Sequence, residues 1–316
     1  MTAALVVVGP TASGKTALAI ELAERLDTEI ISADSMQVYR GMAIGTAAPT
    51  AEEQARVRHH FVGFLDPDEQ YTAGRFGKEA RAVVQTLNAR GRIAVVAGGS
   101  GLYVRALVDG LFSGPAGDPS LRQRLKAEAD AIGTAALYDR LQGVDPAYAA
   151  IVHSGDLRRI VRGLEVYMLT GQPLSALHAA HRQETPPLDV SQVALDIPRE
   201  ALYARINSRV DRMLEAGFVE EVRELMDTGR ADRLLELRTL GYREFAAYLR
   251  GEQGYDEARE AMKRNTRRFA KRQLSWFRND PRIRWRPANK YTNIKEIATT
   301  ILKVGDIRGE IPSGTA

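Results

Sequence analysis

The sequence predicts an α/β fold in which helices cover both faces of a parallel β-sheet and a helical subdomain is inserted into the chain. Continuous apolar runs, typical of buried parallel strands, occur at 4–8, 29–33, 92–98 and 190–196. Helical patterns alternate with them at 16–26, 74–90, 199–227 and 256–278. Turn-forming residues at Gly114–Pro119 and at Pro186-Pro187 delimit the helix-rich segment between the third and fourth strands.

These boundaries predict a core that is interrupted once. The expected parts are a first core segment at 1–114, an inserted helical subdomain at 115–187, a second core segment at 188–303 and a flexible tail at 304–316.

The loop after the first strand carries the clearest chemical signal. Residues 9–16 read Gly9-Pro10-Thr11-Ala12-Ser13-Gly14-Lys15-Thr16, which matches the phosphate-binding pattern G-x-x-x-x-G-K-[ST] in full. A strand precedes this loop and a helix follows it, so backbone N–H groups and the helix dipole would surround a phosphate. Lys15 is expected to reach the outer phosphate, and the Thr16 hydroxyl to bind Mg²⁺. We therefore predict a P-loop NTPase-like core that binds a nucleotide or a diphosphate.

Composition excludes several other chemistries. The chain has 316 residues and no Cys, so disulfides, thiolate nucleophiles and cysteine-held metals are excluded. No apolar run reaches the length of a membrane span, and the N-terminus shows no signal peptide. We expect a soluble, cytoplasmic protein that does not bind membranes, and nothing in the sequence suggests a stable oligomer.

Positive charge is concentrated near the C-terminus. Residues 263–286 contain ten Lys or Arg and one acid, Asp280, so this segment carries +9 and the rest of the chain −5. On the helix at 256–278, one arc contains the cations Arg264, Arg267, Arg268, Lys271, Arg272 and Arg278. The opposite side contains Ala258, Met262, Phe269, Trp276 and Phe277. This separation favours contact with a nucleic-acid backbone over a solvated surface.

Polar residues follow the second and third strands, where ligands of open parallel sheets gather. Asp34 comes directly after the second strand and could ligate Mg²⁺, act as a general base, or simply cap a turn. The third strand ends at Gly98-Gly99-Ser100-Gly101, which suits close backbone approach with a hydroxyl near the phosphates.

Further basic segments and the histidines are less specific. Arg158, Arg159 and Arg162 lie one turn apart on a predicted helix, and Arg238–Arg243 combines a glycine, an aromatic residue and two arginines that could hold a splayed base. His59, His60 and the other histidines lack a third metal ligand, so we expect them to be structural.

Together these residues resemble the tRNA dimethylallyltransferase (tRNA isopentenyltransferase) family over residues 4–287. Besides the loop at 9–16, the matching runs are Asp34–Met42, Ile44–Ala47, His59-His60, Tyr71–Ala73, Gly98–Tyr103, Leu240–Arg243 and Arg272–Phe277. The loop occurs in many NTPases, whereas the Asp34–Met42 and Gly98–Tyr103 runs together are specific.

The resemblance implies transfer of a dimethylallyl group from dimethylallyl diphosphate to N6 of adenine 37, next to the anticodon, with Mg²⁺ as cofactor. It assigns the catalytic site to Asp34, Ser100 and Arg122, with Asp34 as the base that accepts the proton from the exocyclic amine. It implies that tRNA is held by Asp34, Ser35, Met36, Gln37, Arg158, Arg159, Ile160, Val161, Arg162, Arg238, Thr239, Leu240, Gly241, Tyr242 and Arg243. The cationic arc adds Arg264, Arg268 and Lys271, and the inserted subdomain is expected to grip the anticodon stem.

Three positions depart from the family pattern. Ser100 replaces a usual Thr, Ala48 stands where Lys is frequent, and Arg75 stands where an acid is common.

Three other functions stay open. A metabolite or nucleoside kinase explains the loop but not the cationic helix. A nucleic-acid-stimulated ATPase needs an acid after a later strand, which is missing. An adenylate isopentenyltransferase needs neither the insertion nor the basic segment.

Overall fold

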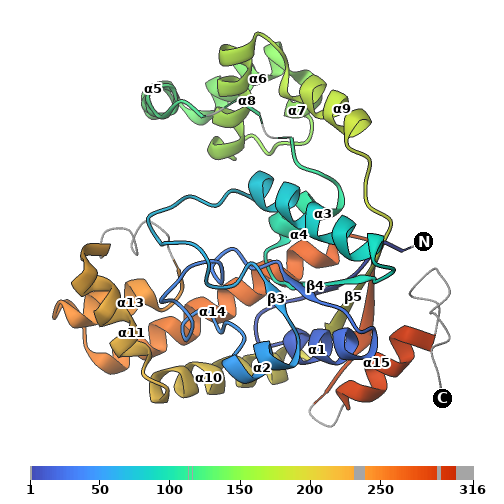
Figure 1. The fold of residues 1–316 in the computed structure, drawn as a ribbon. Helices are drawn as coiled ribbons and strands as arrows, with labels where there is room; N and C mark the ends of the chain where they lie inside the picture. Colours follow the sequence, from blue (N-terminus) through green and yellow to red (C-terminus); the bar gives the residue numbers. More distant parts are fainter. Residues whose placement is uncertain (1, 113, 116, 231–238, 290–292, 304–316) are drawn as a thin grey trace. The chain divides into compact units, whose positions relative to one another are not determined.

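The computed structural model describes residues 2–112, 114, 115, 117–230, 239–289 and 293–303 (Figure 1). The chain divides into two compact units, residues 1–108 with 188–316 and residues 109–187. The second unit thus starts six residues before the boundary of 115 that the sequence predicts. The tail predicted at 304–316 lies outside the described residues.

The first unit is built around a parallel sheet of six strands. Their order is β3-β2-β4-β1-β5-β6, and all five neighbouring pairs are parallel. The strands are β1 Ala4–Val8, β2 Ile30–Ser32, β3 His59–His60, β4 Ala94–Gly98, β5 Val190–Asp196 and β6 Ile283–Pro287. This confirms the predicted α/β class and its parallel sheet.

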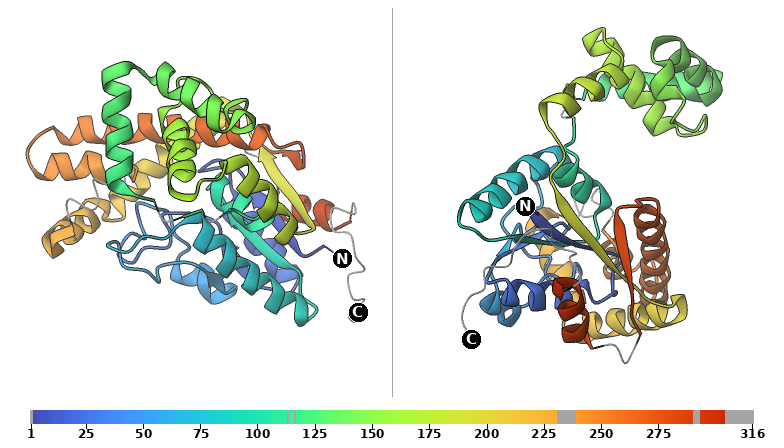
Figure 2. Two further views of the ribbon diagram at one scale, coloured as in Figure 1. Left: turned by 90° about the horizontal axis from the view of Figure 1, so that it is seen from above. Right: turned by 90° about the vertical axis from the view of Figure 1, so that its right-hand side faces the viewer.

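Helices cover this sheet on both faces, as Figures 1 and 2 show. The helices of the unit are α1 Lys15–Arg25, α2 Ala51–Arg56, α3 Ala73–Ala89, α4 Gly101–Val108, α10 Arg199–Glu215, α11 Phe218–Leu225, α13 Tyr242–Leu249, α14 Tyr255–Arg278 and α15 Ile294–Lys303, with a short π-helical turn η1 Met226–Arg230. Helices α3 and α4 lie on one face, and α1 and α15 lie on the other. Leu18 of α1, Ile206 of α10 and Ile301 of α15 share one core with β1 and β5. Removing one such buried side chain to Ala would cost about 2–5 kcal/mol.

Two elements differ from the sequence prediction. The pattern at 199–227 forms two helices, because Gly217 adopts φ 95° between them, a backbone conformation that glycine permits. The apolar-run rule also missed β3 and β6, because β3 has only two residues, both His, and β6 alternates Arg with apolar residues.

The second unit is entirely helical within its described residues. Its helices are α5 Pro119–Ile132, α6 Thr134–Val144, α7 Pro146–Ala149, α8 Leu157–Thr170 and α9 Leu174–Glu184. Asp118 and Asp156 cap α5 and α8 by accepting backbone N–H groups of the first turn. Leu121, Leu137 and Leu164 are among the residues of its own apolar core, so the unit buries its helices against one another.

Candidate active site

The phosphate-binding loop lies between β1 and α1 in the conformation that its glycines allow. Gly9 and Gly14 adopt φ of 146° and 92°, and Ala12 also has a positive φ of 63°. The Ser13 hydroxyl is buried and has no hydrogen-bond partner among the described residues. A buried polar atom without a partner is unfavourable, so this hydroxyl suits an anion held by the loop.

Lys15 stands in the first turn of α1, and its Nζ lies 3.4 Å from the Pro10 carbonyl oxygen. Burial lowers the pKa of Lys15 to about 8, while Asp34 acts to raise it and Arg209 to lower it further. A bound diphosphate would favour the charged ammonium. The environment of Lys15 is therefore prepared for an anion.

The carboxyl ends of β2 and β4 bring Asp34 and Ser100 together, as the sequence predicts from their position. Ser100 Oγ accepts a hydrogen bond from the Ser35 backbone N–H at 2.9 Å and lies 3.2 Å from Ser35 Oγ. Asp34 Oδ1 accepts a hydrogen bond from the Met36 N–H at 3.0 Å, which fixes the turn. A Cβ at Gly98 would overlap the Ala33 backbone, so only glycine fits at the end of β4.

Gln37 has a different role from the one expected. Its side-chain oxygen accepts a hydrogen bond from Ser32 Oγ at 2.8 Å, and its amide nitrogen donates to the carbonyls of Thr46 and Ala47 at 3.3 and 3.0 Å. Both hydrogens of the Gln37 side-chain amide thus donate to backbone carbonyls of the protein. The Gln37 side chain braces the 44–47 loop rather than being offered to RNA.

An open cavity of about 1020 Å³ joins these groups to helices α10 and α14. Lys15, Asp34 and Ser100 line it, together with residues from the second half of the chain that include Arg209, Thr239, Leu240, Thr266, Phe269, Arg272 and Gln273. The cavity therefore joins the phosphate-binding loop and Asp34 to side chains of the second half of the chain.

A smaller cavity of about 330 Å³ shares Lys15 and Asp34 with the larger one. Thr16, the predicted Mg²⁺ ligand, lines it together with His59. Burial lowers the pKa of His59, and its Val57 partner only partly offsets this. The described residues contain no group of three or more His, Cys, Asp or Glu that could hold a metal. A cation here would therefore depend on Thr16 and on the oxygens of a bound ligand.

Two residues that the sequence analysis did not assign to the site contact the loop. Arg209 of α10 donates from Nη1 to Thr11 Oγ1 at 3.3 Å, and burial lowers its pKa, with a further contribution from Arg212. Gln273 of α14 is buried; its Oε1 accepts the Thr11 N–H at 2.9 Å and its Nε2 donates to the Gly99 carbonyl at 2.9 Å. The sequence offers one weak signal, a polar Gln273 on the apolar side of α14.

The segment at 238–243 is only partly as expected. Arg238 lies outside the described residues, whereas Thr239 and Leu240 line the large cavity and Arg243 is exposed. Gly241 is buried with φ 85°, and a Cβ there would overlap Met262 and Phe218, so it shapes the turn before α13.

Tyr242 corrects the expectation that this segment offers an aromatic ring to a base. Its side chain is fully buried, and its hydroxyl donates to Glu221 Oε1 at 2.6 Å. Its ring packs edge-on against Phe218 with 5.0 Å between centroids. Glu221 also accepts hydrogen bonds from the N–H groups of Ile44 and Gly45 at 2.8 and 2.9 Å. Tyr242 therefore supports the 44–47 loop through Glu221.

Helix α14 presents part of the predicted cationic face. Arg264, Arg268, Lys271 and Arg272 are exposed, and Arg268, Arg272 and Arg243 line an open groove of about 580 Å³. Other members of the basic segment are paired with protein groups. Arg267 donates to Asn207 Oδ1 at 2.7 Å, and Arg278 lies 2.8 Å from Asp196.

One cation of the basic segment is buried, and one residue of α14 differs from the helical-wheel prediction. Lys263 is buried on the core side, 2.7 Å from Asp211, which neutralises it. Trp276, predicted to face the core, is 41% exposed because it lies at the margin of the apolar side. A Cβ at Gly101 would overlap its indole, so the ring packs against the start of α4.

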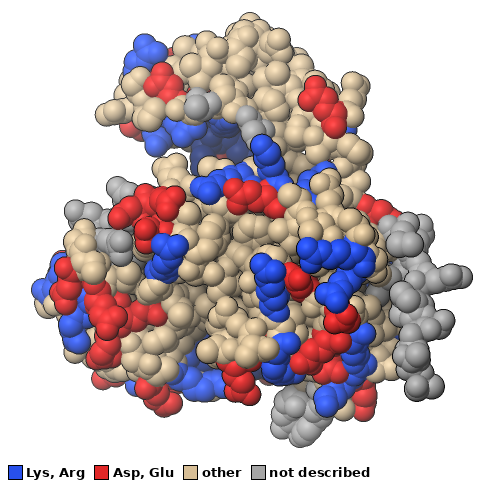
Figure 3. Space-filling view, viewed as in Figure 1, with Lys and Arg blue, Asp and Glu red and all other residues tan. Residues whose placement is uncertain are grey.

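The helical unit contains Arg122, Arg158, Arg159 and Arg162, and Figure 3 shows cationic side chains along one edge of it. Arg158 and Arg159 are exposed, with Arg159 3.3 Å from Asp156. Ile160 and Val161 are buried in the core of the unit, which corrects the expectation that they hold RNA.

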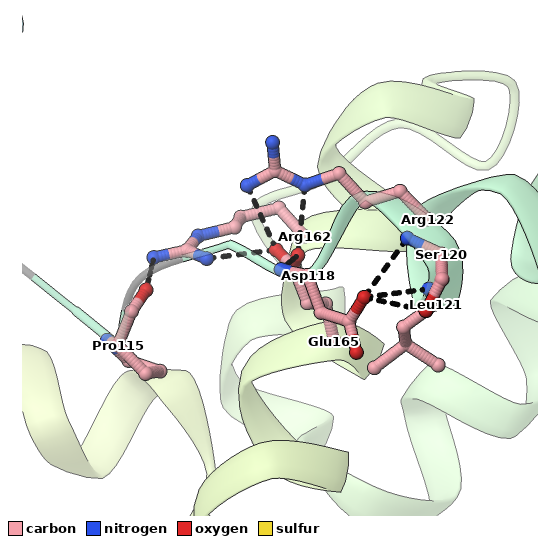
Figure 4. A network of polar contacts seen from close by, with 7 residues as sticks. All are labelled: Pro115, Asp118, Ser120, Leu121, Arg122, Arg162 and Glu165. Atoms are coloured by element: carbon pink, nitrogen blue, oxygen red, sulfur yellow. Dashed lines mark hydrogen bonds and ion pairs between the residues drawn. The ribbon is translucent and has the colours of Figure 1, made fainter.

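Arg122 and Arg162 converge on one buried carboxylate, that of Glu165 (Figure 4). Arg122 Nε lies 2.8 Å from Glu165 Oε1, and Arg162 Nη1 lies 2.7 Å from Oε2. The Asp118 N–H donates to the same carboxylate at 2.9 Å. Although burial raises the pKa of Glu165, hydrogen bonds from Arg162 and Arg122 hold it below its ordinary value. Arg122 thus belongs to the helical unit, whereas Asp34 and Ser100 belong to the sheet unit.

Arg75, another of the three departures from the family pattern, contacts two neighbouring side chains. Arg75 Nε lies 2.9 Å from Glu79 Oε1, and its guanidinium lies 4.9 Å from the Tyr71 ring centroid. Nothing in the structure explains Ala48. Among the described residues, no helix is both long and apolar enough to cross a membrane.

Comparison with solved structures supports the fold. The chain is similar to the full-length tRNA isopentenylpyrophosphate transferase of Bacillus halodurans, with 39% identity, a TM-score of 0.70, and coverage of 94% of this chain and 95% of that one. It is also similar to a eukaryotic dimethylallyltransferase acting on tRNA, with 27% identity, a TM-score of 0.77, and coverage of 95% and 78%. The fold is therefore of the P-loop NTPase-like kind expected from the loop.

Sequence comparison agrees. The chain is 48% identical to the tRNA dimethylallyltransferase of Geobacter sulfurreducens over 296 residues, which cover 93% of this chain and 95% of that protein. It is 49% identical to the same enzyme of Syntrophobacter fumaroxidans over 281 residues, covering 89% and 82%. The family model described as IPP transferase matches residues 37–280. The chain therefore belongs to the IPP transferase family, that of the tRNA dimethylallyltransferases.

Proposed function

We propose that this protein transfers a dimethylallyl group from dimethylallyl diphosphate to N6 of adenine 37 in tRNA, releasing diphosphate. One observation carries the proposal: the anion-binding Lys15 and the carboxylate of Asp34 line the same cavity of about 1020 Å³. An anion site beside a potential base is what prenylation of an amine requires. Exposed cations of α14 border this site, as an RNA substrate needs.

The diphosphate is held by the loop at 9–16. Its backbone N–H groups, the Ser13 hydroxyl and the Lys15 ammonium donate to phosphate oxygens, and Arg209 adds a second cation through its place beside Thr11. A Mg²⁺ ion bound by the Thr16 hydroxyl would neutralise charge that develops on the departing diphosphate. Lys15 and Arg209 supply the same stabilisation from the protein.

Asp34 accepts the proton from the exocyclic amine as the amine attacks. The bond between N6 and C1 of the dimethylallyl group forms, and the bond from C1 to the diphosphate oxygen breaks. The N6 proton passes to the Asp34 carboxylate, so the product amine is neutral. Because Ser100 and Met36 hold the Asp34 turn, the base stays in place without a ligand.

The adenine must leave the anticodon-loop stack to reach Asp34, as for other base-modifying enzymes. Thr239 and Leu240 line the cavity and are available to the flipped base. The exposed Arg264, Arg268, Lys271 and Arg272 contact RNA phosphates, and the helical unit with Arg122, Arg158, Arg159 and Arg162 grips the anticodon stem. We further propose that the enzyme acts as a monomer in the cytoplasm.

The test is a donor competition. The protein is incubated with unmodified tRNA, Mg²⁺ and either dimethylallyl diphosphate or ATP, and the digested nucleosides are weighed. A gain of about 68 Da on one adenosine, the mass of the C5H8 added by attack within the site, is expected with the diphosphate donor only. A tRNA with guanine at position 37 should gain nothing. Consumption of ATP without this gain would favour a kinase or ATPase instead.

A further inference from the structure

The smaller cavity, beside Lys15 and Asp34, is lined by a residue with a polar atom that the proposed chemistry does not use. Its lining is mixed, with Thr16, Ser32 and Asp34 as well as His59. Residues of β2 and β4 line it, and so does His59 of the edge strand β3, which pairs with Ile30. A five-carbon chain would leave the one unpartnered polar atom of this lining, described below, without a hydrogen bond, whereas a water molecule could provide one.

The unused atom is Nε2 of His59. It is buried, and it has no hydrogen-bond partner among the residues that the structure describes. The other ring nitrogen, Nδ1, lies 2.8 Å from the Val57 carbonyl oxygen. A carbonyl can only accept, so Nδ1 carries the proton and Nε2 of the neutral ring offers a lone pair. His59 therefore requires a donor from an occupant of the cavity.

The need for a hydrogen-bond donor to His59 Nε2 distinguishes between the groups that could occupy the cavity. A phosphate oxygen is itself an acceptor and cannot satisfy Nε2. Mg²⁺ prefers oxygen ligands and keeps several of its waters, so direct ligation by an imidazole is disfavoured. A water bound to Mg²⁺ is a polarised donor, and Thr16, the proposed ligand of that ion, lines the same cavity.

Other polar groups of the cavity are engaged elsewhere. Ser32 Oγ donates to Gln37, and the Gln37 amide hydrogens are spent on the carbonyls of Thr46 and Ala47. Asp34 Oδ1 already accepts one hydrogen bond from the Met36 N–H. Among the described residues, His59 Nε2 is the fully buried side-chain atom of this cavity that has no hydrogen-bond partner.

We infer that His59 is a positioning residue of the metal site, which accepts a hydrogen bond through Nε2 from a water on Mg²⁺. The inference rests on the proposed function, because the cation is held jointly by Thr16 and the diphosphate. It revises the expectation that every histidine is structural. Its neighbour His60 differs, since its Nε2 is already 2.6 Å from Glu29 Oε2.

The experiment uses the full chain, inorganic diphosphate and Mn²⁺, which accepts the same oxygen ligands as Mg²⁺. Mn²⁺ affinity is measured by water-proton relaxation, without catalysis. His59→Phe removes the acceptor at similar ring size, and it should weaken Mn²⁺ binding about 10–100-fold, the usual effect of losing an outer partner. His59→Gln restores an acceptor near the Nε2 position and should stay within a few-fold of wild type.

His60→Phe is the matched control in the same strand and should leave Mn²⁺ affinity unchanged. Equal Mn²⁺ affinity of His59→Phe and wild type would overturn the inference, as would equal losses in His59→Phe and His60→Phe or in His59→Phe and His59→Gln. A strong ¹⁴N coupling in the spin-echo spectrum of bound Mn²⁺ would also overturn it, because it indicates direct ligation. If wild type binds Mn²⁺ but fails to prenylate tRNA, the proposed function fails and this inference stands.

Discussion

The side-chain oxygen of Gln273 accepts a hydrogen bond from the backbone N–H of Thr11 at 2.9 Å. Its amide nitrogen donates to the Gly99 carbonyl at 2.9 Å, and a Cβ at Gly99 would overlap this amide. One buried residue of the basic helix α14 thereby joins the phosphate-binding loop to the turn after β4. The conformation of the phosphate-binding loop therefore depends on Gln273 of α14 as well as on the glycines of the loop itself.

Gln273→Met should disturb this junction without a large change in volume. It leaves the Thr11 N–H and the Gly99 carbonyl without their buried partner, at a cost of about 1–3 kcal/mol for each. We expect kcat/KM for dimethylallyl diphosphate to fall about 10–100-fold, mainly through KM, because the loop is less well ordered. Ser275→Ala, at an exposed position of the same helix, should have no effect. Wild-type kinetics for Gln273→Met would refute this role.

Asp34→Asn distinguishes the proposed role of Asp34 as a general base from its role in holding the turn. The amide oxygen of Asn still accepts the hydrogen bond from the Met36 N–H, but Asn cannot take up a proton at neutral pH. We expect kcat to fall by roughly 10²–10⁴, with tRNA affinity within a few-fold of wild type. Asp34→Ala should lose as much in kcat and more in affinity, because it also frees the turn. Single-turnover rates measure the chemical step, and filter binding measures tRNA affinity. An unchanged kcat would show that Asp34 is not the general base.

Charge reversal on α14 tests the RNA surface. Reversing Arg264, Arg268 and Lys271, which are exposed, should flatten the log–log dependence of tRNA affinity on salt by roughly two to three units. Arg90→Glu is the matched control, an exposed cation that follows α3 and precedes the amino end of β4, away from the carboxyl ends where the site lies. Its slope should equal that of wild type. If the tRNA affinity of the wild type did not depend on salt, the cations of α14 would be solvent-exposed charges that do not contact RNA.

The pKa of Lys15 predicts a pH dependence. Burial lowers it to about 8, so Lys15 is charged below that pH and neutral above it. Because the charged form binds the anion, diphosphate affinity without added metal should weaken above about pH 8, by up to about tenfold per pH unit. Lys15→Arg keeps its charge throughout and should bind more weakly but without this dependence. Calorimetric titration at several pH values gives the profile, and a flat one for wild type contradicts it.

Glu165 predicts an acid-sensitive helical unit. Its side chain is fully buried between Arg122 and Arg162, and its pKa is held below the ordinary value. A depressed pKa contributes stability above the ordinary carboxyl pKa, and this is lost as pH falls through the folded value. Glu165→Gln should therefore destabilise the unit at pH 7 by about 1–3 kcal/mol, because the arginines that lose their charged partner are partly exposed, and the difference should shrink toward pH 3.

Hydrogen exchange in α8 reports this difference locally. Glu128→Gln removes a half-exposed ion pair with Arg140 in the same unit, and it should change stability by less than about 1 kcal/mol. If the gap between Glu165→Gln and wild type stayed constant from pH 7 to pH 3, the pair would not be the source of acid sensitivity.

The sheet class, the loop at 9–16 and the nearness of Asp34 to Ser100 could all be predicted from the amino-acid sequence. These features are local, because continuous apolar strands, glycines with positive φ and residues at strand ends act within a few positions. Parallel pairing then brings the carboxyl ends of β1, β2 and β4 to one edge. The residues at that edge could therefore be named before the fold was known.

The roles of the supporting residues could not be predicted in this way, because they depend on contacts between distant parts of the chain. Gln273 bonds to Thr11 across 262 positions, a pairing that no local pattern encodes. The same holds for Tyr242, a candidate base platform in the sequence, whose hydroxyl is instead held by Glu221. It holds also for Ile160 and Val161, which share a motif with arginines but turn to the opposite face of α8. Burial and hydrogen-bond partners depend on how the helices pack, and packing is a property of the folded chain rather than of any segment.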